Sequence, residues 1–266
     1  MQYFIFLYFD QNTMVPFADF LLNRNYTTPP RAGRGRSTPG TPKAQPGNHV
    51  LIPNADLADF QRCVGDQFIL NAIDKYLIKC ANPQHLFNDV TFSDRTKVFV
   101  VTHGIFYEKS DTPTGNVMIN APSVQGVGHT INGTQLAGIL TNNFNLPNQS
   151  FKLMLFICRS GGGRGTFKRL AETYGSDLSM PDVKRALTET VPGKHVETVG
   201  SQVKSALKGG HTQVSVYGYM GAVKFADTGK QAGMTKTNTR AGPARDFLVE
   251  FNADGPILPG DWKRWL

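Results

Sequence analysis

Two short predicted strands each lead into a residue that can take part in covalent catalysis. The apolar run 97–102 is followed by His103 and Gly104, and the run 151–157 is followed by Cys158. A thiolate is a nucleophile, and an imidazole beside it can donate a proton to a departing amine. If the two strands are adjacent and parallel, both side chains emerge at the same edge of a sheet. The sequence therefore suggests a cysteine–histidine pair for acyl chemistry.

The glycines beside these two residues fit the same chemistry. Gly104 leaves room for a substrate carbonyl, and its N–H and that of Cys158 are suited to form an oxyanion hole. The run from Ser160 to Gly163 allows the chain to turn sharply after Cys158 without steric strain.

The elements that must position these residues alternate between strands and helices. Besides the two runs above, strands are expected at 212–219 and 246–251. Helices are expected at 56–78 (with a break near Gly65), 132–140 (with Thr134 as its cap), 166–174, 182–190 and 196–207. The stretch 105–130 is expected to form a loop or hairpin. This pattern predicts an α/β fold with a mostly parallel sheet flanked by helices, in which functional groups gather beyond the carboxyl ends of the strands.

The N-terminal part is predicted to lie outside the main domain. Residues 27–48 are almost entirely Pro, Gly, Ser, Thr and basic residues, which is typical of a linker. The apolar segment 1–9 lacks a positive n-region and a cleavage site, so it is interpreted as a docking strand or targeting segment rather than a cleaved leader. We therefore expect an appendage at 1–48 and one domain at 49–266.

Charge and cysteine content restrict the partners and the compartment. Residues 151–266 hold 17 Lys and Arg against 10 Asp and Glu, whereas residues 1–150 hold 11 against 10. The excess charge predicts an anionic partner for the C-terminal part. Three scattered cysteines without a CxxC motif indicate reduced thiols, a reducing compartment and no metal site. No run of 18 apolar residues is present, so no membrane span is expected.

The pattern of an apolar strand, His103-Gly104, an intervening helix, and a second apolar strand ending at Cys158 resembles a known clan of cysteine peptidases. This clan (clan CD) includes the caspases, gingipains and clostripain, and its members have a caspase-like three-layer sandwich. The basic C-terminal part further resembles the self-cleaving peptidase domains of bacterial RTX toxins and related effectors, which inositol hexakisphosphate activates. The resemblance covers about residues 95–225.

The resemblance implies specific roles. Cys158 would be the nucleophile, His103 the general acid/base, and Gly104 part of the oxyanion hole. Inositol hexakisphosphate would bind a basic pocket after the catalytic cysteine, for which the expected residues are Lys204, Lys208, Lys224, Lys230, Lys236 and Arg240. The substrate would be a protein, and the chain would be a secreted toxin or effector that is delivered into a host cell.

Other interpretations remain open at the level of sequence. A cysteine at a strand end is often a small core residue, and Cys63 and Cys80 are expected to be core residues. The turn 159–166 could hold a phosphate at a helix N-terminus, but it lacks the Gly-Lys-Ser/Thr of a Walker loop. A basic, non-enzymatic module for nucleic acid or a phosphorylated ligand is the main alternative, although no nucleic-acid-binding motif is present. A clan-like enzyme that transfers or ligates acyl groups is a third.

Overall fold

The structure of the chain is a computed structural model. It describes residues 1–31, 38–44, 47–106, 115–124, 126, 129–162, 198–219, 221–225, 234–236, 248–252 and 255–257. The helices expected at 166–174 and 182–190 lie outside these residues, as do Lys230 and Arg240.

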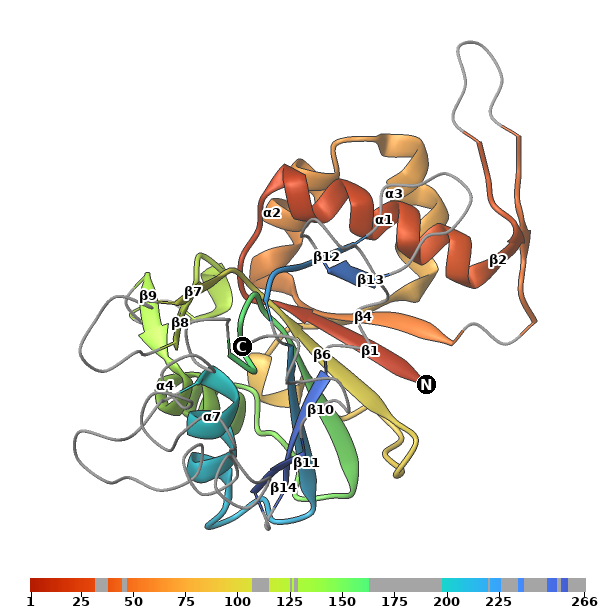
Figure 1. Cartoon of the computed structure of the whole chain (residues 1–266). Coiled ribbons are helices and arrows are strands. Elements are labelled where there is room, and N and C mark those ends of the chain that lie inside the picture. The colour runs from red at the N-terminus through yellow and green to blue at the C-terminus, as the bar shows by residue number, and fades with distance from the viewer. Residues whose placement is uncertain are drawn as a thin grey trace.

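An eight-stranded sheet forms the centre of the molecule (Figure 1). In order across the sheet its strands are β5 (Leu77–Cys80), β4 (Asn48–Pro53), β1 (Gln2–Phe6), β6 (Lys97–Val101), β10 (Phe151–Phe156), β11 (Val214–Tyr219), β14 (Leu248–Asn252) and β15 (Gly255–Ile257). The six strands from β5 to β11 are parallel, and β14 and β15 are antiparallel additions at one edge. The predicted α/β fold with a mostly parallel sheet is confirmed.

The N-terminal strand β1 lies inside this sheet and not in an appendage. It pairs with β4 on one side and with β6 on the other, and its residues Phe4 and Ile5 are buried. A continuous apolar run is typical of a strand that is covered on both faces. The predicted appendage at 1–48 is therefore wrong for β1 and the helix that follows it, which belong to the same sheet and core as the rest of the domain.

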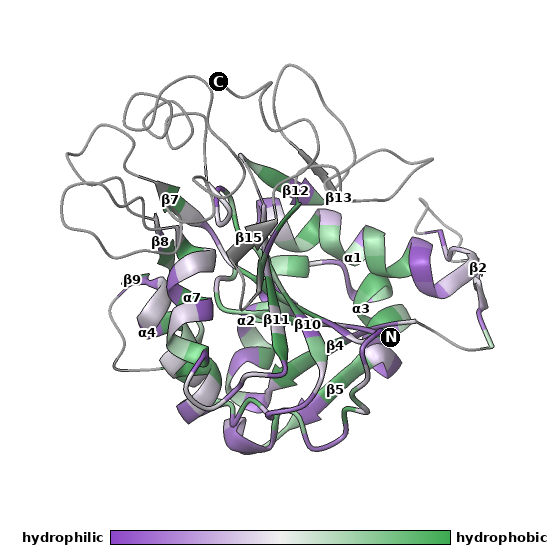
Figure 2. Ribbon diagram, turned by 60° about the horizontal axis from the view of Figure 1, so that its bottom comes forward, coloured by the Kyte–Doolittle hydropathy of each residue, from purple (hydrophilic) through white to green (hydrophobic). Residues whose placement is uncertain are grey.

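Helices cover both faces of the sheet, which gives three layers. They are α1 (Gln11–Asn25), α2 (Asn54–Val64), α3 (Gln67–Ile73), α4 (Gly133–Gly138) and α7 (Val199–Leu207), with short helical turns η1 (Asp74–Tyr76), η2 (Pro83–His85), η3 (Pro122–Val124) and η4 (Ile139–Asn143). On one face, α1 and α2 pack through Phe17 and Phe60 against Phe4 and Phe6 of β1. On the other face, α4 packs beside α7, which crosses Phe251 of β14 at Gly200. Figure 2 shows the apolar strands between more polar helices.

Three small sheets complete the described chain. They are a hairpin of β2 (Tyr26–Thr28) and β3 (Thr41–Pro42), a three-stranded sheet of β7 (Gly104–Phe106), β8 (Gly115–Met118) and β9 (Thr130–Asn132), and a pair of β12 (Val223–Phe225) and β13 (Met234–Lys236). The hairpin projects from the body of the molecule (Figure 1) and contains the described part of the expected linker. The stretch 105–130, expected to form a loop or hairpin, contributes to the three antiparallel strands β7 to β9.

Two helix predictions need correction. The helix expected at 56–78 breaks at Gly65, as predicted, because this residue adopts a left-handed φ of 73°. Its last residues, Leu77 and Ile78, instead form β5, where pairing with β4 outweighs a helical apolar spacing. The cap of α4 is Asn132 rather than Thr134, because the Asn132 side chain accepts from the Gln135 N–H and the Gln135 side chain completes a capping box.

Among the described residues, no helix combines the length and the apolar character needed to cross a membrane.

Candidate active site

His103 and Cys158 follow neighbouring parallel strands at the same edge of the sheet. β6 and β10 pair in register through Val101 and Phe156, so each of the two residues lies two positions beyond a paired residue. The backbones touch just after this point, since a Cβ added to Gly104 would overlap the carbonyl oxygen of Cys158. The prediction that both side chains emerge at one sheet edge is confirmed.

His103 is held by two residues from the segment that follows β1. Its Nε2 lies 2.9 Å from Oδ2 of Asp10, and its ring meets the ring of Tyr8 nearly edge to face, with centroids 4.9 Å apart. The His103 side chain is 44 % exposed. A carboxylate on one ring nitrogen fixes the tautomer and leaves Nδ1 for a substrate or a thiol, which is the arrangement of a general base oriented by a third group.

The place of Asp10 follows from the start of α1. Its Oδ1 accepts a hydrogen bond from the Thr13 N–H at 3.0 Å, so it is the N-cap of α1 and its Oδ2 is directed to His103. Asp10 was not among the site residues predicted from the sequence. A buried strand followed by Asp and then by a helical pattern was the signal that could have identified it.

Cys158 lies half-buried at the entrance to a tight turn. Its Sγ donates to the carbonyl of Val223 at 3.6 Å, and in the described part of the chain no hydrogen bond joins it to His103. The next residue, Arg159, has a left-handed φ of 60°, and its N–H donates to the carbonyl of Gly221 at 2.7 Å. A non-glycine residue in this conformation costs about 1–3 kcal/mol and is concentrated at functional sites.

The turn after Cys158 is fixed by a buried serine. The Ser160 hydroxyl donates to the Leu155 carbonyl and accepts from the Tyr219 N–H, both at 2.9 Å, and so joins β10 to β11. Gly162 has a φ of 116°, which is consistent with the prediction that glycines permit the turn. Gly163 lies outside the described residues.

Gly104 has a structural role beside any catalytic one. The Met118 N–H donates to the His103 carbonyl at 2.8 Å, and hydrogen-bonded pairs alternate along an antiparallel ladder. The Gly104–Val117 pair is therefore a non-hydrogen-bonded pair, and the Gly104 N–H is directed away from β8. Glycine is needed here because a side chain would meet the Cys158 backbone and Ile157.

The expected anion-binding lysines Lys204, Lys208 and Lys224, whose side chains are described, do not come together. The Lys204 ammonium donates to the carbonyl of Val214 at the start of β11. This is the edge at which the parallel strands begin, opposite the edge at which they end and Cys158 lies. Burial lowers the pKa of Lys204. Lys208 ends α7 at that same edge and is exposed. Among the expected residues whose side chains the structure describes, Lys224 lies on the side of the cysteine, exposed on β12 next to the Val223 that contacts Cys158. Lys236 is described only as a backbone position of β13, where it pairs with Val223.

The other two cysteines are positioned differently. Cys63 is buried in α2, which confirms it as a core residue, and Cys80 is half-buried at the end of β5. Burial raises the pKa of both thiols. Within the described ranges, no group of three His, Cys, Asp or Glu side chains is arranged to hold a metal ion.

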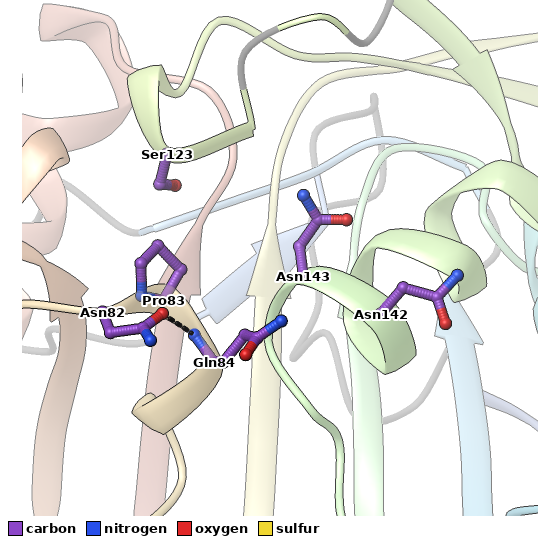
Figure 3. A pocket seen from close by; sticks show the side chains of 6 residues that line it. All are labelled: Asn82, Pro83, Gln84, Ser123, Asn142 and Asn143. Atoms are coloured by element: carbon purple, nitrogen blue, oxygen red, sulfur yellow. Dashed lines mark hydrogen bonds between the residues drawn. The ribbon is translucent and has the colours of Figure 1, made fainter.

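A pocket of about 430 Å³ is lined by none of these residues (Figure 3). It is lined by Asn82, Pro83, Gln84, Ser123, Asn142 and Asn143, which come from η2, η3 and η4 and their ends. None of these side chains titrates in the range of acid–base catalysis. Its lining therefore contains no acid or base suited to that role.

Comparison of the chain with protein-family models, with curated proteins and with solved structures finds no match.

Proposed function

We propose that the chain is a cysteine peptidase in which Cys158 is the nucleophile, His103 the general acid/base and Asp10 the residue that orients His103. The observation that carries the proposal is the meeting of three strand ends at one sheet edge. Cys158 and His103 follow the neighbouring strands β10 and β6, and Asp10 follows β1 and binds His103 at 2.9 Å.

The proposed reaction uses each group at a stated atom. His103 takes the proton of the Cys158 thiol at Nδ1, and the thiolate attacks the substrate carbonyl carbon. The carbonyl oxygen gains the negative charge and accepts a hydrogen bond from the N–H of Gly104, which is directed away from β8. The imidazolium returns its proton to the leaving amine as the C–N bond breaks. Water then cleaves the thioester and restores the thiol.

We also propose that a polyanion such as inositol hexakisphosphate activates the chain, with fewer of the expected residues binding it. Lys224 supports it, because this exposed ammonium is one residue from the carbonyl that accepts from Cys158. Lys204 does not fit such a pocket, since its ammonium is bonded to Val214 at the other edge. Lys208, at the same far edge, does not fit either. Lys230, Lys236 and Arg240 stay predictions from the sequence, as does a role as a secreted effector.

The experiment that tests the function is digestion of a mixed peptide library by the folded chain, with and without inositol hexakisphosphate, followed by mass spectrometry. New termini that depend on Cys158 and vanish in Cys158→Ser support the proposal. Products that carry one added water identify hydrolysis, whereas joined peptides identify ligation. Unchanged peptides in every condition, together with salt-dependent binding of DNA or RNA, would replace the proposal with the basic binding module.

A further inference from the structure

We propose that Asn120 is a positioning residue of the proposed active site, which acts by clamping the segment that carries Tyr8 and Asp10. This inference rests on the proposed function and extends it. Asn120 lies just after β8, and its side chain forms two hydrogen bonds with the backbone of a residue 111 positions earlier in the chain.

The clamp is a reciprocal pair of hydrogen bonds with Phe9. The Phe9 N–H donates to Oδ1 of Asn120 at 2.7 Å, and Nδ2 of Asn120 donates to the Phe9 carbonyl at 3.0 Å. A carboxamide matches a peptide group in this way because it offers one acceptor and one donor side by side. Both bonds restrain the same residue, so they fix the orientation of its peptide groups as well as its position.

The backbone around Asn120 strengthens the attachment. The N–H groups of Asn120 and Ala121 both donate to the carbonyl of Leu7, at 3.0 and 3.2 Å. The segment between β1 and α1 is therefore held at Leu7 by main-chain bonds and at Phe9 by a side chain. Tyr8 lies between these two points, and Asp10 follows directly.

Residues 118–121, the segment that contains Asn120, are also attached to the strand that carries His103. The Met118 N–H donates to the His103 carbonyl at 2.8 Å, and the Thr102 hydroxyl donates to the Met118 carbonyl. Residues 118–121 thus connect the exit of β6, which carries His103, with the exit of β1, which carries Asp10. Within residues 118–121, Asn120 is the residue whose side chain binds the segment after β1, through its two hydrogen bonds with Phe9.

Positioning matters here because His103 is 44 % exposed. An exposed imidazole keeps one orientation only through its partners, and in the described structure these include Asp10 and Tyr8. Phe9 lies between these two partners in sequence, so a shift of its peptide groups displaces both contacts. We therefore expect the loss of the Asn120 side chain to weaken proton transfer at His103 without removing any reacting group.

The test is a double-mutant cycle between Asn120→Ala and Asp10→Asn in the full chain. The measured quantity is the rate at which iodoacetamide alkylates Cys158 at about pH 6, where a free thiol is almost entirely protonated. We expect each single variant to react more slowly, with Asn120→Ala slower by on the order of tenfold, and the double variant to be little slower than Asp10→Asn alone. Asn132→Ala is the matched control, because it removes an asparagine side chain that caps α4 and does not contact residues 7–10.

Each outcome decides a different point. The positioning role is overturned if Cys158 of Asn120→Ala is alkylated as fast as that of the wild type. It is also overturned if the rate loss of the double variant is the full product of the losses of the two single variants. Asp10→Asn and His103→Ala that both react like the wild type overturn the proposed function, and the inference with it. If Asn120→Ala does not fold, Asn120→Asp takes its place in the cycle, because it keeps an acceptor for the Phe9 N–H and replaces the donor to the Phe9 carbonyl with a second, charged oxygen.

Discussion

Oδ2 of Asp10 lies 2.9 Å from Nε2 of His103, although 93 residues separate the two in the chain. The contact joins the ends of β1 and β6, which are neighbours at the middle of the sheet. From β1 the chain continues to β4 and β5 on one side, and from β6 it continues to β10 and β11 on the other. In open α/β sheets ligands bind beyond the carboxyl ends of the strands where the strand order reverses in this way. Asp10 and His103 lie at that position, and Cys158 follows the next strand.

Gly104→Ala should destabilise the fold. The added Cβ would overlap the carbonyl oxygen of Cys158 and lie 2.8 Å from Cγ2 of Ile157. Overpacking of this kind costs about 1–3 kcal/mol in the free energy of unfolding, measured by urea denaturation. Gly209→Ala is the control, because no atom lies within 4 Å of the Cβ it would add. Equal stability of the two variants would contradict the close approach of β7 to Cys158.

Asp56 should make the stability depend on pH in the acid range. Burial raises the pKa of its carboxyl group, and two hydrogen bonds from Ser123 offset part of the rise. The folded chain therefore keeps this proton to a higher pH than the unfolded chain. Asp56 favours folding most below its unfolded pKa of about 4, and this contribution is lost as the pH rises to the folded pKa.

The corresponding measurement compares unfolding free energies of the wild type and Asp56→Asn from about pH 4 upwards. The wild type should lose stability relative to the variant as the pH rises, and the difference should then become constant. Asp94→Asn, at an exposed position just before β6, provides the control. Parallel curves for wild type and Asp56→Asn, or a difference of the opposite sign, would show that the carboxyl group is not perturbed by burial.

Lys224 and Lys204 should respond differently to a polyanion. Alkylation of Cys158 titrated with inositol hexakisphosphate should need on the order of fivefold more ligand in Lys224→Ala, because one charged hydrogen bond contributes about 1 kcal/mol or more. Lys204→Met should leave that titration unchanged, since its ammonium is bonded to Val214 at the other edge of the sheet. A loss of response in Lys204→Met but not in Lys224→Ala would contradict this placement.

Much of the fold and half of the site could be predicted from the sequence. The runs that became β6, β10 and β11 are short, apolar and rich in β-branched or aromatic residues, and such runs are typical of strands buried on both faces. Because parallel strands end at one edge, His103 and Cys158, which follow β6 and β10, were correctly expected at the same edge of the sheet.

The rest depended on where β1 lies in the sheet. An apolar segment before a Pro- and Gly-rich stretch fits an appendage as well as a central strand, and only pairing with β4 and β6 decides between them. The partners of Asp10 and Asn120 could not be identified for the same reason, since they lie 93 and 111 positions away in the chain. Charge counting likewise could not show that Lys204 and Lys224 lie at opposite edges.

The most direct test of the account is the reactivity of the three thiols at about pH 6, followed by intact mass and peptide mapping after treatment with iodoacetamide. Cys63 and Cys80 are internal standards, because burial raises the pKa of both thiols and keeps them protonated. The account predicts that Cys158 reacts first in the wild type and that His103→Ala slows Cys158 alone. A Cys158 that reacts no faster than Cys63 and Cys80, or that is unaffected by His103→Ala in a folded chain, would contradict a catalytic role for this pair.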